Sequence, residues 1–171
     1  EGIDVNQAKT TTGSTPLLMA CQNGHAPIVE LLLASSEITV NQAITNDGST
    51  PLFLACQNGH TPIVKLLLAA SDIDVNQAKT TTGITPLFMA CQNGHAPVVE
   101  LLLASSEIDV NQAETTIGCT PLFMTCQDGH APIVELLLAS SGINVNEPLM
   151  NGATPLIIAS YLGQASCVSL L

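Results

Sequence analysis

The sequence predicts an all-α repeat solenoid, built as a stack of short helix–turn–helix units. The triplet Thr-Pro-Leu begins at Thr15, Thr50, Thr85, Thr120 and Thr154, at spacings of 35, 35, 35 and 34 residues. Nearly the same sequence follows each of the first four triplets, and single glycines and prolines recur at fixed positions of the units. Such self-similarity is the signature of a repeat architecture, and breakers this regular delimit structural units.

Each unit is expected to hold two helices. Thr15 is a good N-cap, and Pro16 suits the first helical position, where its missing N–H costs nothing. The first helix then runs through an apolar stretch to Asn23-Gly24, and Pro27 begins a second one. Both are shorter than the ~12–15 residues that an isolated helix needs in water, so packing must hold them. The segment 74–83 has no helical period and is rich in Thr and Asn, which predicts an extended arm that returns by a turn.

The combined pattern Gly-x-Thr-Pro-Leu-x-x-Ala-x-x-x-Gly-His-x-x-Ile-Val-x-x-Leu-Leu, followed by Asp-Val-Asn, resembles the ankyrin repeat. The resemblance covers essentially the whole chain as about five repeats of mostly 35 residues, against a usual period of 33. It implies a short β-hairpin finger and two antiparallel helices per repeat, stacked with a concave binding face. The usual His after Thr-Pro-Leu is replaced by bulky residues, which we expect to pack between repeats: Leu18, Phe53, Phe88, Phe123 and Ile157.

The resemblance also suggests boundaries for a single ankyrin-like repeat domain over residues 1–171. Residues 1–12 resemble the end of a preceding repeat. Four repeats follow at 13–47, 48–82, 83–117 and 118–151, and 152–171 is a truncated last repeat. Because neither end has an obvious polar capping repeat, we expect the chain to be a piece of a longer solenoid whose last helix frays.

Composition excludes several classes of partner. Lys and Arg number 3 against 14 Asp and Glu, so the formal charge is −11 and phosphate-rich surfaces are disfavoured. Aromatic residues make up 2% of the chain, which leaves no platform for stacking bases. We therefore expect a monomer that binds a protein or peptide, with a preference for basic ones, and neither nucleic acid nor membrane.

The His and Cys residues occupy repeated slots, and each slot has a structural explanation. His25, His60, His95 and His130 share the Gly-His slot, where we expect the ring to satisfy backbone groups of the turn. Equivalent atoms in stacked repeats lie ~8–10 Å apart, so these rings cannot converge on a zinc ion at about 2.0–2.3 Å. Cys21, Cys56, Cys91 and Cys126 share a helical slot and are too far apart for disulfides.

Free buried thiols favour a reducing, intracellular compartment, and hence the cytoplasm. Cys119, which precedes Thr120, is the one thiol expected to be exposed. No nucleophile has a partner that could activate it. We therefore expect no enzyme activity, no cofactor and no metal.

Differences between repeats show where the sequence is free to encode recognition. They fall in the fingers and in the slot before each Thr-Pro. The Gln-Asn pairs at the ends of the first helices vary little, but the family resemblance places them on the same concave face. Gln and Asn offer both donors and acceptors, which could read a peptide backbone. The candidate partner-binding residues are Lys9, Thr11, Thr12, Ser14, Gln22, Asn23, Ile44, Asn46, Asp47, Ser49, Gln57, Asn58, Lys79, Thr81, Thr82, Ile84, Gln92, Asn93, Glu114, Thr116, Ile117, Cys119, Gln127 and Asp128.

A modification site is also suggested by the family, in which the Asn of the Val-Asn pair hydrogen-bonds between fingers and is hydroxylated in some members. The matching candidates are Asn41, Asn76 and Asn111.

The leading functional hypothesis is a non-catalytic protein–protein interaction module. The first alternative is an architectural spacer solenoid within a larger protein, which the near-identity of the repeats favours. The second is an engineered, consensus-like scaffold, which the six Cys and the missing polar caps disfavour.

Overall fold

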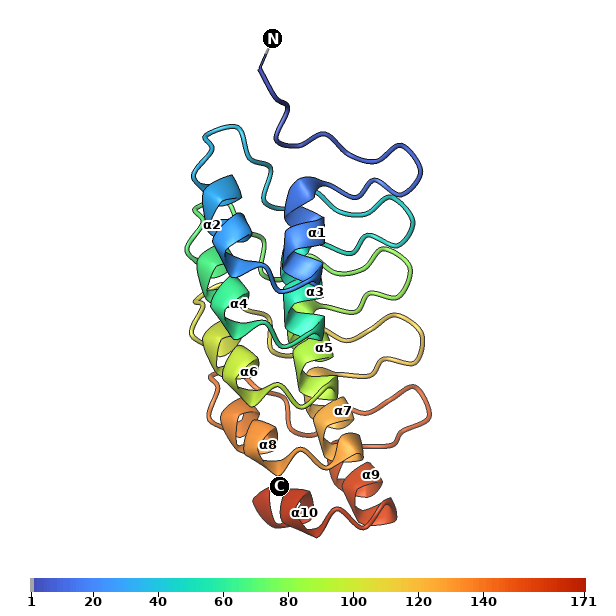
Figure 1. Ribbon diagram of the computed structural model, residues 1–171. Coiled ribbons are helices and arrows are strands. Elements are labelled where there is room, and N and C mark those ends of the chain that lie inside the picture. Colours follow the sequence, from blue (N-terminus) through green and yellow to red (C-terminus); the bar gives the residue numbers. More distant parts are fainter. Residues whose placement is uncertain (1) are drawn as a thin grey trace.

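The computed structural model describes residues 2–171 and shows two parallel columns of short helices (Figure 1). Each of five units contributes one inner helix and one outer helix. The inner helices are α1 (Pro16–Gln22), α3 (Pro51–Gln57), α5 (Pro86–Gln92), α7 (Pro121–Asp128) and α9 (Pro155–Tyr161). The outer helices are α2 (Ala26–Leu33), α4 (Thr61–Leu68), α6 (Ala96–Leu103), α8 (Ala131–Leu138) and α10 (Ala165–Leu170). The predicted stack of helix–turn–helix units is confirmed.

The inner helices begin where the Thr-Pro signal places them. In α1 the Thr15 side chain accepts a hydrogen bond from the Leu18 amide at 3.2 Å, and Pro16 occupies the first helical position. The same cap recurs at Thr50, where the Phe53 amide donates at 3.1 Å, and in each later repeat. Each cap satisfies an amide that the first turn of a helix would leave without a partner.

The core is a continuous apolar column between the two layers of helices. It contains Leu, Ala and Cys residues from the inner helices and Val, Ile and Leu residues from the outer ones. Within residues 2–171 all six cysteines are free and buried. Burial raises the pKa of Cys21, Cys91, Cys119 and Cys126 to about 12, and it also raises the pKa of Cys56 and Cys167. These thiols therefore behave as small apolar side chains.

The Phe residues that follow Thr-Pro-Leu pack between repeats, as expected. Phe53, Phe88 and Phe123 are at most 2% exposed. They belong to two smaller clusters beside the main core, on the side where the fingers leave the inner helices. This column fixes the fingers to the helices.

Asn side chains join the repeats at the base of the fingers. The Asn41 amide nitrogen donates to the Asp72 carbonyl at 2.6 Å, and its oxygen accepts from the Asp74 amide at 3.0 Å. Asn6, Asn76 and Asn111 form the same pair of bonds, always to the residues 31 and 33 positions ahead. Each Asn therefore clamps one repeat to the next by both ends of its amide.

His side chains form a second line of connections. The Nε2 atoms of His60, His95 and His130 lie 3.1–3.3 Å from the carbonyl oxygens of Gln22, Gln57 and Gln92 in the preceding repeat. In the last repeat Gln164 replaces His, and its Nε2 donates to the Gln127 carbonyl at 3.2 Å. The expectation that the His rings satisfy backbone groups is confirmed for these three, although the partner lies one repeat away, whereas the His25 ring makes no such bond within residues 2–171.

Each ring also needs a glycine beneath it. Gly59 has φ +68°, and a Cβ at this position would lie 2.8 Å from the His95 ring.

The fingers are turns rather than paired strands. No β-strand forms within residues 2–171, so the predicted β-hairpin is not reproduced. Each finger is closed by short backbone bonds, such as Lys79 N–H to the Ile84 carbonyl at 2.9 Å and Gly83 N–H to the Lys79 carbonyl at 2.8 Å. One backbone bond links neighbouring fingers, as from Thr80 N–H to the Asp47 carbonyl at 2.9 Å. A single bond per pair is too few for a ladder.

Candidate partner-binding face

Most of the sequence-predicted binding residues lie on the fingers, which project from one side of the stack (Figure 1). We define the finger face as the five fingers together with the adjoining side of the inner helices (Figure 1). The finger tips are exposed, including Thr11, Asn46, Thr81 and Thr116. Other candidates lie at the ends of the inner helices, where Gln22, Asn58, Asn93 and Asp128 are all exposed. The stacking thus brings residues that lie 35 positions apart onto one surface.

Half-buried apolar side chains lie between the fingers and the inner helices. Ile44, Ile84 and Met89 pack against the Phe53 cluster, and Met124 and Leu149 pack against the Phe123 cluster. The Met residues share one helical slot with Leu54, which sequence reasoning did not single out as part of the site. The signal was available, because Met19, Met89 and Met124 also recur at the repeat period. Flexible Met side chains suit a surface that adapts to a partner.

One ion pair joins two fingers. The Lys79 ammonium lies 2.6 Å from the Asp47 carboxylate and 5.3 Å from the centre of the Phe53 ring. Partial burial alone would raise the pKa of Asp47, but hydrogen bonds from Lys79 and Ser49 hold it below its usual value. The Lys79 side chain, at 22% exposure, is therefore committed to its neighbours and offers a partner only a part of its charge.

Glu114 occupies the same slot in the next finger and turns inward. Its carboxylate accepts from the amides of Ile117 at 2.8 Å and Cys119 at 3.0 Å, and from both the amide and the hydroxyl of Thr116. Burial acts to raise the pKa of Glu114, but these hydrogen bonds outweigh it and lower the pKa to about 2. Glu114 is thus a brace for the turn of its own finger.

Three candidate contact residues are removed from the surface by burial. Ser49 is 2% exposed, Cys119 is 1% exposed and Glu114 is 7% exposed. The expectation that Cys119 carries an exposed thiol is wrong, because apolar side chains of its own and the neighbouring repeats pack against it. Cys119 lies with Phe88 and Phe123 in one cluster. These residues shape the fingers and cannot meet a partner directly.

The Gln-Asn pairs divide into a structural and a free residue. The Asn58 and Asn93 amides donate to the carbonyls of Gln22 and Gln57, at 3.4 and 2.8 Å, and so hold the preceding repeat. The side chains of Gln22, Gln57 and Gln92 make no hydrogen bond within the described part of the chain. The Gln side chains therefore keep their hydrogen-bond donors and acceptors free for a partner.

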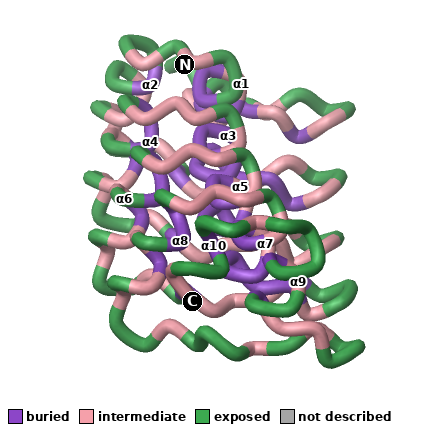
Figure 2. The backbone as a smooth tube through the Cα atoms, turned by 90° about the horizontal axis from the view of Figure 1, so that it is seen from below, coloured by how far each residue is buried: buried purple, intermediate pink, exposed green. Residues whose placement is uncertain are grey.

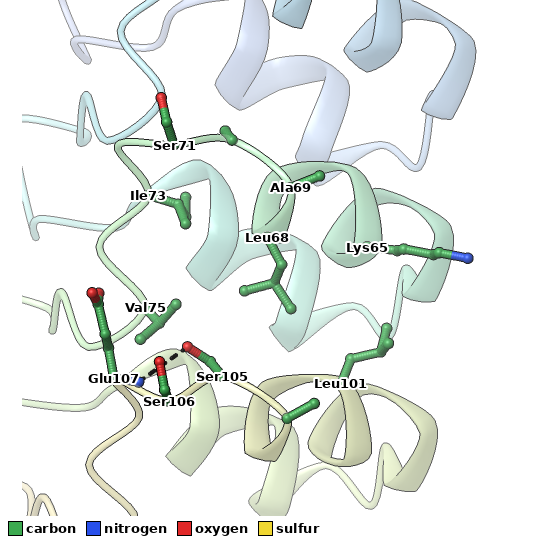
Figure 3. A pocket seen from close by; sticks show the side chains of 12 residues that line it. Lys65, Leu68, Ala69, Ser71, Ile73, Val75, Leu101, Ser105, Ser106 and Glu107 are labelled. Carbon is green, nitrogen blue, oxygen red and sulfur yellow. Dashed lines mark hydrogen bonds between the residues drawn. The ribbon is translucent and has the colours of Figure 1, made fainter.

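One hollow lies away from the finger face. A shallow space of about 540 Å³ separates the loops that leave α4 and α6, and Leu68, Val75 and Leu101 line it (Figure 3). Ser105, Ser106 and Glu107, which follow α6, line its other side. The Lys65 side chain points away from the space (Figure 3). No charged groups converge there, so we assign it no ligand.

The described residues contain neither a metal-binding cluster nor a helix that could span a membrane. Between residues 2 and 171, no three His, Cys, Asp or Glu side chains come together in a way that could hold a metal ion. None of the helices in this range combines the length and the apolar character that crossing a membrane requires.

Comparison with known families agrees with the geometry. A family model described as ankyrin repeats in three copies matches four overlapping ranges, 1–79, 17–114, 72–148 and 106–171. Together these ranges span the chain. The chain belongs to the ankyrin repeat family. Comparison with curated proteins gives no significant match.

Membership of the ankyrin repeat family explains why the helix caps, the glycines and the side chains that connect repeats recur at the same positions in each repeat. Ankyrin repeats are generally protein–protein interaction modules and are typically not catalytic. As in other solenoids, each ankyrin repeat of this chain contacts its direct neighbours, so one side can vary in sequence while the core stays constant.

Proposed function

We propose that the chain is a non-catalytic binding module that holds a protein or peptide partner on its finger face. The observation that carries this proposal is the separation of the molecule into an invariant core and a variable, exposed finger face. The tips at Asn46, Thr81 and Thr116 are exposed, whereas the Phe column behind them is buried. Variation is thus concentrated where it does not disturb packing.

The chemistry of the finger face suits an extended polypeptide. Free Gln amides could pair with a peptide backbone, and the half-buried Met and Ile side chains behind them could receive apolar side chains. Most acidic residues lie on the outer helices, such as Glu30, or on the loops that directly follow them, such as Glu37 and Asp72. Their field favours basic partners at long range, whereas contact specificity comes from the fingers.

The remaining parts of the proposal follow the sequence. We propose that residues 1–171 act as one domain, and that free thiols reflect an intracellular, reducing site of action. Asn41, Asn76 and Asn111 are candidates for hydroxylation. Because both ends of each amide are bonded to the next repeat, modification requires local opening of that clamp.

The test compares two matched double variants as baits in cell lysates. Asn46→Arg with Thr81→Arg changes the finger face, and Ser36→Arg with Ser106→Arg changes exposed outer loops by the same charge. None of these four side chains makes a hydrogen bond in the described structure, and all four are exposed, so both variants should fold normally. A protein that is retained by wild type and by the loop variant, and lost from the finger variant, supports the proposal.

Equal and sparse recovery on all three baits would favour the alternative of an architectural spacer. The near-identity of the repeats is the observation that favours this alternative, because a binding surface diversifies as it becomes specific for one partner.

A further inference from the structure

One serine recurs in the loop that follows each of the first four outer helices. We call its four copies the loop serines, and all of their side chains are exposed: Ser36, Ser71, Ser106 and Ser141. These loops lie along the edge of the stack opposite to the fingers (Figure 1), and Figure 2 shows exposed backbone along that edge. The loop serines are therefore open to an enzyme that approaches away from the finger face.

The hydroxyl of a loop serine has no structural role in the stack. The side chains of Ser36, Ser106 and Ser141 make no hydrogen bond within residues 2–171, whereas the serine just before each of them does, as where Ser105 accepts from the Glu107 amide at 3.4 Å. The Ser71 hydroxyl donates to the carboxylate of its exposed neighbour Asp72 at 3.3 Å. None of these bonds ties a loop serine to the core.

Two of the loop serines are followed by a carboxylate at the first and at the third position further on: Ser71 by Asp72 and Asp74, and Ser106 by Glu107 and Asp109. All four acidic residues are exposed, and none of them forms an ion pair in the described part of the chain. Two successive loops therefore present an accessible hydroxyl beside two carboxylates that no cation of the chain neutralises.

The fold holds the more distant carboxylate in the same place in both loops. One oxygen of Asp74 accepts a hydrogen bond from the Asn76 amide at 3.0 Å, and Asp109 accepts the equivalent bond from the Asn111 amide at 3.0 Å. The backbone amides of both Asp residues donate to the Asn clamp of the preceding repeat. The two loops thus repeat one fixed arrangement of backbone and carboxylate.

The other two loop serines lack part of this pattern: Ser36 is followed by Glu37 and Thr39 at the same two positions, and Ser141 by Gly142 and Asn144. Asn144 shows that the turn does not need a carboxylate, because its side-chain oxygen accepts from the Asn146 amide at 3.2 Å. The chain therefore carries, in equivalent loops, two serines with both carboxylates, one with a single carboxylate and one with none.

We propose that Ser71 and Ser106 are phosphorylation sites for a protein kinase with a basic substrate groove. The serine Oγ attacks the γ-phosphorus of ATP and forms a bond to it, while the bond from that phosphorus to the bridging oxygen breaks and ADP leaves. The hydroxyl proton passes to the aspartate base of the kinase. The two carboxylates pair with cations of the groove, and this charge pattern selects the two serines.

A phosphate at these positions would act on the junctions between repeats. The Asn41 clamp bonds to the Asp72 carbonyl and the Asp74 amide, and the Asn76 clamp bonds to residues 107 and 109 in the same way. A phosphoserine adds a charge of about −1.5 to −2 at neutral pH. Lys65 points away from the hollow that both serines line (Figure 3), so the phosphate would repel the adjacent carboxylates and weaken the clamps.

The test is phosphorylation of the full native chain by an acid-directed protein kinase with ATP. Intact mass counts the phosphates and peptide mapping locates them, and an arginine-directed kinase is the control. Asp74→Asn with Asp109→Asn removes the more distant carboxylate from both loops, and the Asn144 turn shows that this change is compatible with the fold. The matched gain variant is Thr39→Asp, which completes the pattern after Ser36.

Wild type should take up two phosphates, at Ser71 and Ser106, about tenfold faster than Ser36 or Ser141, a ratio that corresponds to about 1.4 kcal/mol. The double Asn variant should lose this advantage, and Thr39→Asp should raise the rate at Ser36 to that of Ser71. The arginine-directed kinase should modify none of the four. The doubly phosphorylated chain should unfold at lower urea than the unmodified one, by less at about 500 mM than at about 50 mM NaCl.

Several outcomes contradict the proposal. If a free peptide of residues 66–78 is phosphorylated and the native chain is not, the folded loop excludes the kinase; if neither is modified, the pattern is not recognised. Equal rates at all four loop serines, or unchanged rates in the double Asn variant, show that the carboxylates do not select the site. An unchanged urea midpoint removes the effect on the junctions. Because the site is separate from the finger face, it stands or falls independently of partner binding there.

Discussion

Replacement of Phe88 by Ala tests whether the Phe column is structural. Phe88 is 2% exposed and lies with Cys119 and Phe123 in one apolar cluster. Complete burial of such a side chain contributes about 1.5–3 kcal/mol by transfer from water. The cavity that Ala would leave between two repeats adds to this loss, so the free energy of unfolding should fall by about 3–5 kcal/mol.

The matched control is Ile157→Ala, in the same slot of the last repeat. Because Ile157 is 54% exposed, the change removes about half of a buried side chain and should cost about 1 kcal/mol. Both values can be measured by urea denaturation followed by far-ultraviolet circular dichroism. If Phe88→Ala costs no more than Ile157→Ala, the column does not hold the repeats together, and a role as an apolar ligand stripe becomes the better explanation.

Three further predictions follow from particular contacts. Glu114→Gln should lower the urea midpoint of unfolding at neutral pH. The pKa of Glu114 is lower in the native chain than in the unfolded one, so protonation removes the bracing carboxylate, and the difference from wild type should vanish as the pH falls from about 4.5 to about 2. A difference that persists at pH 2 would contradict this. Gly59→Ala should destabilise more than Gly142→Ala, since both have positive φ, which costs about 1–2 kcal/mol, but only the first Cβ meets a His95 ring at 2.8 Å; equal losses in thermal melts would show that the ring moves freely. All six thiols should resist a thiol reagent in the native chain and react fully in urea; rapid reaction of one native thiol would show that its repeat opens.

The repeat period alone is enough to predict the helices, their caps and the buried Phe column. The period works because each repeat must present the same surfaces to its neighbours, so every slot has one environment. Thr15 and Pro16 could therefore be assigned correctly from sequence, and the structural role of His60, His95 and His130 could be recognised. The prediction failed where side chains depart from the repeat.

Cys119 and Glu114 illustrate the failure. Both lie in a single finger, and their burial depends on contacts within that finger and with its neighbour rather than on a slot shared by all repeats. The ion pair between Lys79 and Asp47 has the same origin: the two residues are 32 positions apart, and no other repeat carries the same combination. Lateral contacts that occur once leave no periodic signal in a single sequence.

The fifth finger shows where this chain tolerates a change in length. The last repeat follows at 34 residues rather than 35, and the missing residue falls in this finger, where Gly152 N–H bonds to the Leu149 carbonyl three positions back, while Gly83 N–H reaches four positions back to Lys79. The shorter finger still bonds to its neighbour, from Met150 N–H to the Ile117 carbonyl, and Thr154 still caps the inner helix behind it. The loss of a residue at the finger tip thus leaves the stacking of the repeats unchanged. We therefore expect that new recognition loops can be introduced at the tips while the rest of the molecule keeps its register.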